Sequence, residues 1–211
     1  MRYIYLFVFI NKYIQMRTAY LLTTNPQSTR AVFSKKVLEN IGFNVIVFNA
    51  ILHRDKVLSN KISMMHIYSM ILNSQEEWAY VFEDDINTVE PIHIDEIIEY
   101  EKISQMFFYL GCCVIPYMDT IQYSGYAINS NPVMQISGGV RGLHAIGIHR
   151  NGAMKLLEFA TNHENRYMDC ILEDFSKIYP ANIVRYDLCS PQIAGHRGVL
   201  FQDRQQFPST I

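Results

Sequence analysis

One short stretch of this sequence, residues 78–86, constrains the fold more than any other. It reads WAYVFEDDI: five mostly apolar residues, three consecutive carboxylates and one more apolar residue. An apolar run that ends abruptly in charge is typical of a buried β-strand that finishes at the edge of its sheet. Carboxylates repel one another and lose hydration when buried, so Glu83, Asp84 and Asp85 need a cation or hydrogen-bond donors to offset the cost. We expect a divalent metal ion to supply that offset.

The alternation of side chains along a strand predicts how these acids are directed. Glu83 and Asp85 should point to one side of the strand and Asp84 to the other. Two carboxylates on one side can share a hard cation and leave its other coordination positions to phosphate oxygens. Response regulators and polymerases also end strands in acidic pairs, and a solvated acidic loop is the simpler alternative, so the pattern needs structural context.

The size and composition of the chain favour one compact domain. Its 211 residues are 49% hydrophobic and 18% charged, which is enough apolar material for a substantial core. The formal net charge is -2. Because the Lys and Arg residues are also scattered along the chain, no basic field is expected that would gather nucleic acid.

The cysteines and the N-terminus indicate where the protein works. The four cysteines form no C-x-x-C pair and have no zinc spacing, which favours a reduced, cytoplasmic setting; they are Cys112, Cys113, Cys170 and Cys189. Residues 1–15 form an apolar extension, but its run is too short to span a bilayer and lacks a small-residue cleavage site. We therefore expect no transmembrane segment, and we interpret the extension as an added edge strand or a clip.

The first half of the chain, residues 18–86, alternates strands with helices. Expected strands cover residues 18–23, 43–48 and 78–83, and expected helices cover residues 28–41, ended by Gly42, and 59–72. The apolar run in residues 43–48 predicts a parallel strand that is covered on both faces. This order places the three acids at the carboxyl end of a strand, which is where open α/β sheets bind their ligands.

The second half, residues 87–211, has a different pattern. Helical spacing disappears between residues 115 and 148, where short β-like runs are punctuated by Gly, Asn and Pro and predict hairpins. The other elements expected are helices over residues 91–103, 151–160 and 168–178, strands over 106–110, 143–148 and 183–186, and a tail with little regular pattern. The fold class predicted is therefore α/β, a single domain over residues 1–211 with a mixed central sheet flanked by helices.

Five segments, taken in order, resemble one known family. The chain resembles glycosyltransferases of the GT-A fold, in particular glycosyltransferase family 25, the lipopolysaccharide-type sugar transferases, and the small sugar transferases of large DNA viruses such as the chloroviruses. The segments are AYLLTTNPQSTR (19–30), NKISMMHIYSMIL (60–72), WAYVFEDDI (78–86), GLHAIGIHRNGAMKLLE (142–158) and RYMDCILEDF (166–175).

The resemblance implies a fold and an activity. It implies a single GT-A domain, Rossmann-like, with a nucleotide-binding half over residues 18–86 and an acceptor-side half and tail over residues 87–211. The implied reaction is metal-dependent transfer of a sugar from a UDP-sugar donor to a hydroxyl of a glycan or glycoprotein acceptor, with inversion. The implied cofactor is Mn²⁺ or Mg²⁺, and the implied protein is a monomer or weak dimer in the cytoplasm, or in the host cytoplasm if it is viral.

The resemblance also implies a metal-binding set. Asp85 matches the last acid of the family's metal motif and is the first ligand expected. Glu83 matches the first acid of the motif and is expected to be either a second ligand or bonded to ribose and water. A third ligand has to come from elsewhere in the chain, and His196 near the C-terminus is the candidate, since imidazole is a tolerable ligand for manganese. The simpler interpretation of His196 is an exposed loop histidine.

One further carboxylate is expected to act as the base. Asp169 matches the Asp that begins a helix in the family, and a helix N-terminus keeps a carboxylate ionised. Removing the proton of the acceptor hydroxyl is the role implied for it. Asp169 is equally well explained as a helix cap, and Glu173 and Asp174 are the reserve candidates.

The remaining candidates would hold the donor. Arg30 can fork onto phosphate oxygens or be an exposed helix residue, and His144 can touch the donor sugar or be a hydrogen-bonded core histidine. Arg204 in the tail can neutralise the diphosphate. The full donor-binding set expected is Thr23, Thr24, Arg30, Lys61, Ser63, Asp84, His144 and Arg197.

Two other functions remain open from the sequence. A metal-dependent phosphoesterase or nucleotidyltransferase would use the same acids, but it usually needs further His or Asp pairs for a second metal ion. A catalytically inactive module that binds a nucleotide-sugar and serves as an interaction domain would keep the fold without the chemistry. The sequence does not identify the donor sugar, the acceptor or the linkage.

Overall fold

A computed structural model describes residues 16–115, 121–163 and 166–208, without the side chains of residues 143 and 144. The apolar extension predicted over residues 1–15 and the side chain of His144 lie outside the described residues. In the described stretches, no helix combines the length and the apolar character that crossing a membrane requires.

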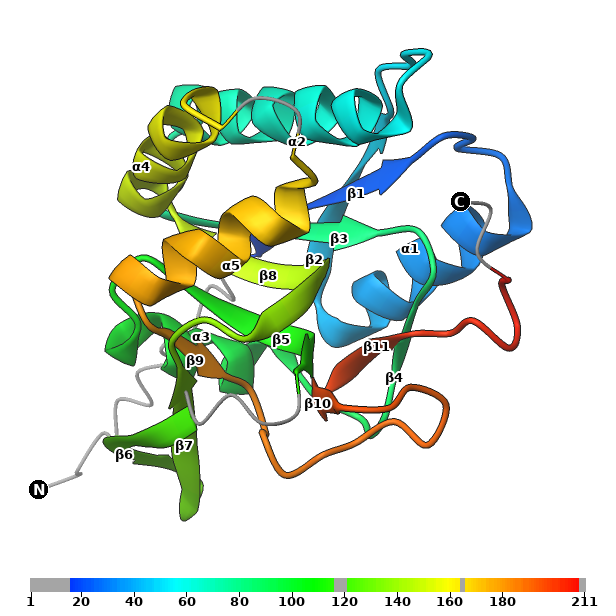
Figure 1. Cartoon of the computed structure of the whole chain (residues 1–211). Coiled ribbons are helices and arrows are strands. Elements are labelled where there is room, and N and C mark those ends of the chain that lie inside the picture. Colours follow the sequence, from blue (N-terminus) through cyan, green and yellow to red (C-terminus); the bar gives the residue numbers. More distant parts are fainter. Residues whose placement is uncertain (1–15, 116–120, 164–165, 209–211) are drawn as a thin grey trace, which may run out of the picture.

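A mixed sheet forms the centre of the described part of the molecule (Figure 1). Its strands lie in the order β2-β1-β3-β8-β5-β9-β7-β6, and β10 pairs with β5; a separate two-stranded sheet joins β11 to β4. The strands are β1 (Arg17–Thr23), β2 (Phe43–Asn49), β3 (Trp78–Glu83), β4 (Ile86–Thr88), β5 (Phe107–Val114), β6 (Ile121–Ile128), β7 (Asn131–Ile136), β8 (Val140–His149), β9 (Ala181–Ile183), β10 (His196–Gly198) and β11 (Leu200–Gln202).

The sheet is parallel at one end and mixed beyond it. β1 pairs in parallel with β2 and with β3, while β8 runs antiparallel between β3 and β5. This confirms the prediction of a mixed central sheet. The prediction that the second strand is covered on both faces is wrong: β2 is the edge strand, and its outer face is open to solvent at Asn44 and at Ile46, which is 39% exposed.

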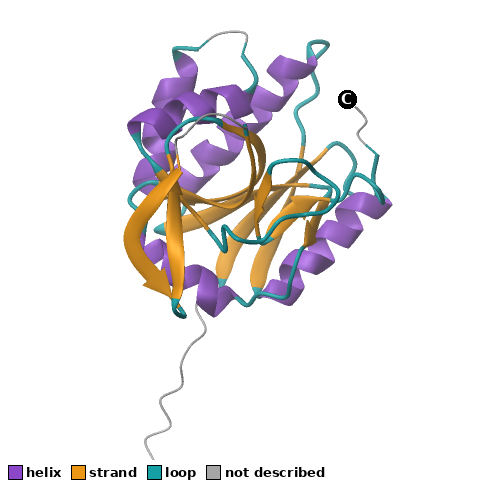
Figure 2. Cartoon of the chain, turned by 60° about the horizontal axis from the view of Figure 1, so that its bottom comes forward, coloured by secondary structure: helices purple, strands orange, loops and turns teal. Residues whose placement is uncertain are grey.

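Helices cover both faces of the sheet, as Figures 1 and 2 show. α2 (Lys56–Asn73), α4 (Arg150–Thr161) and α5 (Met168–Ile178) pack on one face, and α1 (Thr29–Ile41) and α3 (Ile94–Ile103) pack on the other. The strands alternate between the two cores: in β3, Ala79 and Val81 join the core under α2, whereas Tyr80 and Phe82 join the core under α3. β3 therefore buries both of its faces, as the apolar run of residues 78–82 predicts.

Capping residues fix where the first two helices begin and end. The Ser28 side chain accepts a hydrogen bond from the backbone N–H of Ala31, and Gly42, with a φ of 111°, ends α1 in the left-handed region that favours glycine. Asp55 caps α2 in the same way as Ser28 caps α1. Because of this cap, α2 begins at Lys56, three residues earlier than the helical spacing predicts.

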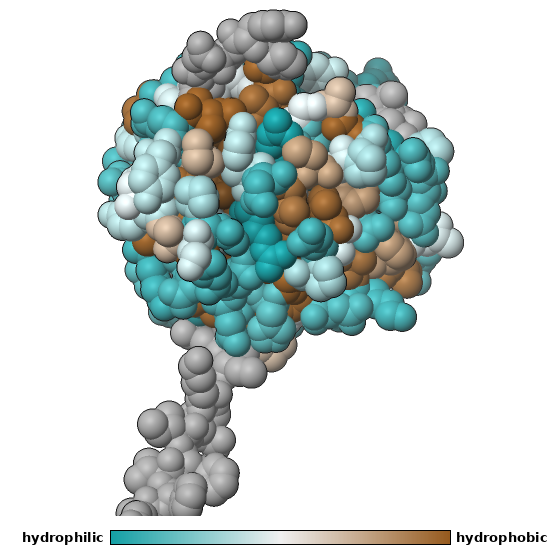
Figure 3. Space-filling view, turned by 90° about the horizontal axis from the view of Figure 1, so that it is seen from below, coloured by the Kyte–Doolittle hydropathy of each residue, from teal (hydrophilic) through white to brown (hydrophobic). Residues whose placement is uncertain are grey.

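In the described part of the segment that was predicted to form hairpins, one hairpin is present. β6 and β7 form an antiparallel hairpin, turned by Asn129 and Ser130, whose φ angles of 50° and 67° suit a two-residue loop. The face seen from below in Figure 3 carries several small hydrophobic patches, each bordered by hydrophilic side chains. Patches of this kind are ordinary on a protein surface.

A buried carboxylate ties the outer helix α3 to the centre of the sheet. Glu101 is 7% exposed and accepts two hydrogen bonds from Arg17, with Nε–Oε1 at 2.8 Å and Nη2–Oε2 at 2.6 Å. It also accepts a hydrogen bond of 2.7 Å from the hydroxyl of Tyr80. This fork fixes the starts of β1 and β3 relative to each other, and the carboxyl ends of the same two strands carry the polar residues described below.

We predict that Glu101→Ala lowers the free energy of unfolding by about 3–5 kcal/mol, because the partly buried guanidinium of Arg17 and the buried Tyr80 hydroxyl would both lose this partner. The matched control is Glu99→Ala on the same helix, which removes an exposed pair with Lys102 and should cost less than about 1 kcal/mol. Urea denaturation measures both values. Equal losses in the two variants would contradict the role given to Glu101.

Candidate functional site

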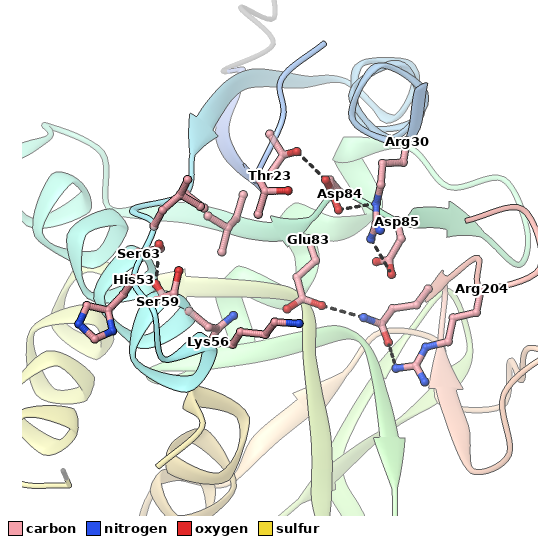
Figure 4. A pocket seen from close by; sticks show the side chains of 16 residues that line it. Thr23, Arg30, His53, Lys56, Ser59, Ser63, Glu83, Asp84, Asp85 and Arg204 are labelled. Carbon is pink, nitrogen blue, oxygen red and sulfur yellow. Dashed lines mark hydrogen bonds and ion pairs between the residues drawn. The ribbon is translucent and has the colours of Figure 1, made fainter. Parts of the chain in front are cut away.

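A cavity of about 370 Å³ opens at the carboxyl ends of β1 and β3. Its walls are the end of β1, the first turn of α1, the segment after β2, the first two turns of α2, the three acids at the end of β3, and the end of β11 with the segment that follows it (Figure 4). Open α/β sheets bind ligands at this edge. The structure therefore brings the acids to the place that the order of elements predicts.

The acids are not directed as strand alternation predicts. β3 ends at Glu83, and Asp84 and Asp85 form a turn before β4 begins at Ile86. Asp84 and Asp85 both meet Arg30, while Glu83 meets a different partner. The expectation that Asp85 shares a side with Glu83, opposite Asp84, is wrong because the regular strand stops before the second acid.

Arg30 lies between the two aspartates. Its Nε is 2.8 Å from Oδ1 of Asp84, and its Nη2 is 3.3 Å from Oδ2 of Asp85. The hydroxyl of Thr23 donates a 2.5 Å hydrogen bond to the other oxygen of Asp84. In Asp85, the second oxygen, Oδ1, is buried and has no hydrogen-bond partner among the described residues. Of the four carboxylate oxygens of Asp84 and Asp85, Oδ1 of Asp85 is thus left without a donor.

Glu83 is held by the C-terminal segment. Nε2 of Gln202 donates a 2.7 Å hydrogen bond to Glu83, and Nη2 of Arg204 donates a 2.8 Å bond to Oε1 of Gln202. Burial, followed by the negative charges of Asp85 and Asp169, raises the pKa of Glu83 to about 7. Burial also raises the pKa of Asp85, and the positive charge of Arg30 opposes that shift. Both acids lie where added positive charge would stabilise them.

We call Glu83, Asp84 and Asp85, at the end of β3, the acidic turn. The last described segment is attached directly to it. β11 pairs antiparallel with β4, so that Gln202 lies opposite Ile86. The backbone N–H of Asp203 donates a 2.7 Å hydrogen bond to the carbonyl of Asp85, and Nδ2 of Asn87 donates a 3.0 Å bond to Asp203. These bonds place Gln202 and Arg204 on the wall of the cavity. The tail is therefore part of the site, although the sequence predicts little regular structure there.

Positive side chains enter the cavity from three elements. Arg30 comes from α1, Lys56 from the first turn of α2 and Arg204 from the segment after β11 (Figure 4). Lys56 was missed by sequence reasoning because the helix was expected to begin at residue 59. The sequence feature that would have predicted the place of Lys56 is Asp55, since an N-cap residue predicts that the helix begins directly after it. With these cations beside the acids, the cavity offers partners to an anion and to a cation.

Most of the predicted donor-binding residues line this cavity, and some do not. The predicted residues that the structure brings together there are Thr23, Thr24, Arg30, Ser63, Glu83, Asp84 and Asp85. Ser63 is fully buried, and its hydroxyl donates to the carbonyl of Ser59 and accepts from the N–H of Ile51. It therefore shapes the wall more than it offers a free group.

Lys61 and Arg197 do not reach the cavity. The ammonium of Lys61, a residue that is 6% exposed, donates to the backbone carbonyl of His163 and so joins α2 to the segment after α4. The guanidinium of Arg197 lies 5.3 Å from the ring centroid of Tyr186 and contacts the sulfur of Cys189. Neither contact supports the donor-binding role predicted for these two residues. The backbone of His144 lies in β8, and its predicted contact with the donor falls on an undescribed side chain.

The placement of His196 corrects its predicted role as a metal ligand. The residue is fully buried. Its Nδ1 accepts a 2.9 Å hydrogen bond from the N–H of Ser190, and its Nε2 lies 2.7 Å from the carbonyl of Leu200. Burial lowers the pKa of His196, which favours a neutral ring that donates from Nε2. Because both ring nitrogens are already bonded, His196 organises the turn before β11 and is not placed to bind a metal ion.

Asp169 is not among the residues that line the cavity. It lies in the first turn of α5, as predicted, and its charge contributes to the raised pKa of Glu83. Of the reserve candidates, Asp174 pairs with Arg166 and with Lys177, which hold its pKa below the usual range. These contacts give Asp174 a structural role on the surface of α5 and leave Asp169 as the carboxylate of α5 whose charge acts on Glu83.

The fit of a metal ion is judged from the donor atoms themselves. Among the described residues, no three His, Cys, Asp or Glu side chains converge as a complete metal site. Glu83 and Asp85 nevertheless offer carboxylate oxygens, and the unpartnered Oδ1 of Asp85 is an oxygen of the kind that hard cations bind. Mg²⁺ is commonly held by one or two carboxylates together with substrate phosphates. The residues present fit that kind of site, without a histidine.

Comparisons with known proteins add two likenesses. No family profile matches this chain, and neither does any curated protein sequence. Among solved structures, A197 from STIV is similar over 79% of this chain and 81% of that one, with 11% identity and a TM-score of 0.42. The apo-form glycosyltransferase GlyE of Streptococcus pneumoniae TIGR4 is similar over 79% of this chain and 44% of that one, with 9% identity and a TM-score of 0.42. At these TM-scores the likenesses carry no functional argument.

The raised pKa of Glu83 predicts how stability changes with pH. Because its pKa is about 7 in the folded protein and 4.5 ordinarily, the folded state binds more protons than the unfolded state between these values. The free energy of unfolding should therefore fall as pH rises from 4.5 to 7. In Glu83→Gln this contribution is absent, so its stability should fall by about 1–3 kcal/mol less over that interval.

Urea denaturation of chelator-treated wild type and Glu83→Gln at several pH values measures this difference. The amide that replaces the carboxylate keeps an oxygen that can accept from Gln202, so the hydrogen bond is matched. Parallel stability profiles for the two proteins across pH 4.5–7 would show that Glu83 does not titrate as described.

Proposed function

We propose that this protein is a metal-dependent glycosyltransferase that moves a sugar from a UDP-sugar to a hydroxyl of a glycan or glycoprotein, with inversion, in the cytoplasm. The observation that carries the proposal is the cavity at the carboxyl ends of β1 and β3, where carboxylates of the acidic turn face Arg30, Lys56 and Arg204. A nucleoside diphosphate needs both kinds of partner, since its phosphate oxygens bind side-chain cations directly and bind carboxylates through a shared metal ion.

The GT-A fold is part of the proposal. The support for it is the resemblance of the five sequence segments, together with a parallel strand–helix half that ends in acids and a second half that contains the β6–β7 hairpin and three helices. In this arrangement residues 18–86 supply most of the donor cavity, and the tail after β11 closes it.

Glu83 and Asp85 would hold Mn²⁺ or Mg²⁺, with the remaining positions left to phosphate oxygens and water. The bound ion supplies charge neutralisation to the diphosphate leaving group. Lys56 and Arg204 carry the same kind of charge on the other walls of the cavity, so they would stabilise the negative charge that develops on the diphosphate as the bond to the sugar breaks. Thr23 holds Asp84 in place through its hydroxyl.

Asp169 would act on the acceptor side. It lies in the first turn of α5, where the partial positive charge of the helix N-terminus attracts a negative group. In the proposed reaction Asp169 accepts the proton of the acceptor hydroxyl as that oxygen attacks the anomeric carbon. Attack from the face opposite the diphosphate inverts the configuration at that carbon.

Two other functions predict different products when the protein is incubated with UDP-sugars. A metal-dependent phosphoesterase or nucleotidyltransferase would cleave or transfer at phosphorus, and mass analysis of products from a panel of UDP-sugars distinguishes that outcome from sugar transfer. A catalytically inactive interaction module would yield no product with any donor. The described residues offer no second cluster of acids and histidines for a two-metal site.

We predict that UDP binds in a Mn²⁺-dependent way and that Asp85→Ala weakens this binding at least tenfold, because the variant loses the free carboxylate oxygen. Isothermal titration calorimetry with UDP, with and without Mn²⁺, measures the affinities. Asp187→Ala, which changes a carboxylate that does not line the cavity, is the control. Unchanged UDP affinity and turnover in Asp85→Ala would remove the metal site from the proposal.

For the base, we predict that Asp169→Asn keeps the UDP affinity of the wild type and lowers the rate of sugar transfer by about 10²–10⁴-fold. Asp174→Asn on the same helix is the control, because its carboxylate is engaged with Arg166 and Lys177, and its rate should stay near that of the wild type. The rates are measured with whichever UDP-sugar of the panel gives product. Full turnover by Asp169→Asn would rule it out as the base.

A further inference from the structure

We propose that Arg30 acts as a built-in counter-ion that occupies the acidic turn in the nucleotide-free protein and competes with the divalent cation for it. When the cation and a diphosphate enter together, the guanidinium moves from Asp84 and Asp85 to the phosphate oxygens. This inference rests on the proposed function and adds to it a coupling between metal binding and nucleotide binding.

The competition follows from where Arg30 lies. It belongs to the first turn of α1, and its guanidinium is within 3.3 Å of carboxylate oxygens on both aspartates. The side chain of Arg30 is 20% exposed, and those of Asp84 and Asp85 are 12% and 7% exposed. Charges this far from bulk water are screened less than surface charges, so the guanidinium offsets much of the repulsion within the turn.

A second observation shows that this offset is incomplete. The residue Asp85, counted with its backbone, is 5% exposed and lines the cavity. Its Oδ1 has no hydrogen-bond partner among the described residues. Arg30 reaches only Oδ2 of this carboxylate. An unpartnered charged oxygen in a buried position is costly, and an entering cation would bind it. The acidic turn therefore retains an affinity for positive charge even while Arg30 is present.

A divalent cation bound to Asp85 would repel the guanidinium beside it. Two positive charges a few Å apart repel more strongly in a poorly solvated cavity than in water. The cation must therefore bind against the charge of Arg30 or displace it. In both cases Arg30 lowers the affinity of the nucleotide-free protein for the metal ion.

A diphosphate gives Arg30 another partner in the same cavity. The guanidinium is a planar fork that fits two phosphate oxygens as well as it fits carboxylates. Its side chain already lines the cavity together with Lys56 and Arg204. Once Arg30 has moved to the phosphates, the carboxylates are available to the cation, so each ligand raises the affinity for the other by the same factor.

The first experiment measures Mn²⁺ binding without nucleotide, from the free Mn²⁺ signal in electron paramagnetic resonance. Arg30→Gln should bind Mn²⁺ about 5–150-fold more tightly than the wild type, the usual range of a coupling between sites. The matched control is Lys36→Gln, an exposed residue on the same helix that loses the same charge without touching the acids. Its affinity should stay close to that of the wild type.

Two further measurements guard against misfolding of Arg30→Gln. This variant removes the guanidinium beside two buried aspartates, so its fold is checked by circular dichroism, and Mn²⁺ should raise its melting temperature more than that of the wild type. The second measurement uses another variant, Arg30→Lys. Arg30→Lys keeps the charge but has no fork with which to bridge both aspartates. Its affinity for Mn²⁺ should therefore lie between those of the wild type and Arg30→Gln.

The second experiment measures UDP binding by calorimetry at saturating Mn²⁺. Arg30→Gln should bind UDP more weakly than the wild type, because the phosphates lose one partner. The factor by which Mn²⁺ raises UDP affinity should also be smaller in this variant. Lys36→Gln should match the wild type in both respects.

The outcomes separate this inference from the proposed function. If Arg30→Gln gains no affinity for Mn²⁺ while the wild type binds Mn²⁺ with UDP, the competition is overturned and the proposed function is untouched. If Arg30→Gln gains Mn²⁺ affinity but binds UDP as the wild type does, the transfer of Arg30 to the phosphates is overturned. If neither the wild type nor any variant binds Mn²⁺ in the presence of UDP, the metal-dependent function fails first, and the inference fails with it.

Discussion

The repulsion among three consecutive carboxylates is the constraint on which the site depends. Glu83, Asp84 and Asp85 lie at the end of a strand that is buried on both faces, so their charges cannot be left to water alone. Two residues from distant parts of the chain offset these charges. Arg30 of the first helix forms ion pairs with the two aspartates, and Gln202 of β11 donates a hydrogen bond to Glu83. Residues from α1 and from β11 therefore meet at the end of β3.

The part of the fold that sequence reasoning recovers is the part set by local patterns. The apolar run of residues 78–82 predicts a buried strand, and Gly42 predicts the end of a helix, because each effect acts within a few residues. The direction of the acids was predicted wrongly for a local reason as well. Strand alternation applies only while the strand continues, and β3 stops at Glu83.

The contacts that sequence reasoning misses join residues far apart in the chain. Gln202 and Glu83 are separated by 119 positions, and nothing near either residue indicates the pairing of β11 with β4 that brings them together. His196 shows the converse error: a histidine in a glycine-containing segment resembles a free loop ligand, but the fold buries it and bonds both ring nitrogens. Whether such a side chain is available is decided by tertiary packing, which a single sequence does not contain.

The same tertiary contacts limit what a metal site here can be. Since both ring nitrogens of His196 are bonded to Ser190 and Leu200, the described residues offer a cation only the carboxylate oxygens at the end of β3, and under the proposed function the remaining ligands would come from substrate or water. Such an incomplete site would bind a cation weakly when alone and more strongly when a diphosphate completes it. In the proposed competition Arg30 would enlarge this difference, because it adds positive charge beside Asp84 and Asp85 until phosphate oxygens attract it. The incomplete ligand set and the guanidinium would thus act in the same direction, and both would make cation binding depend on the nucleotide.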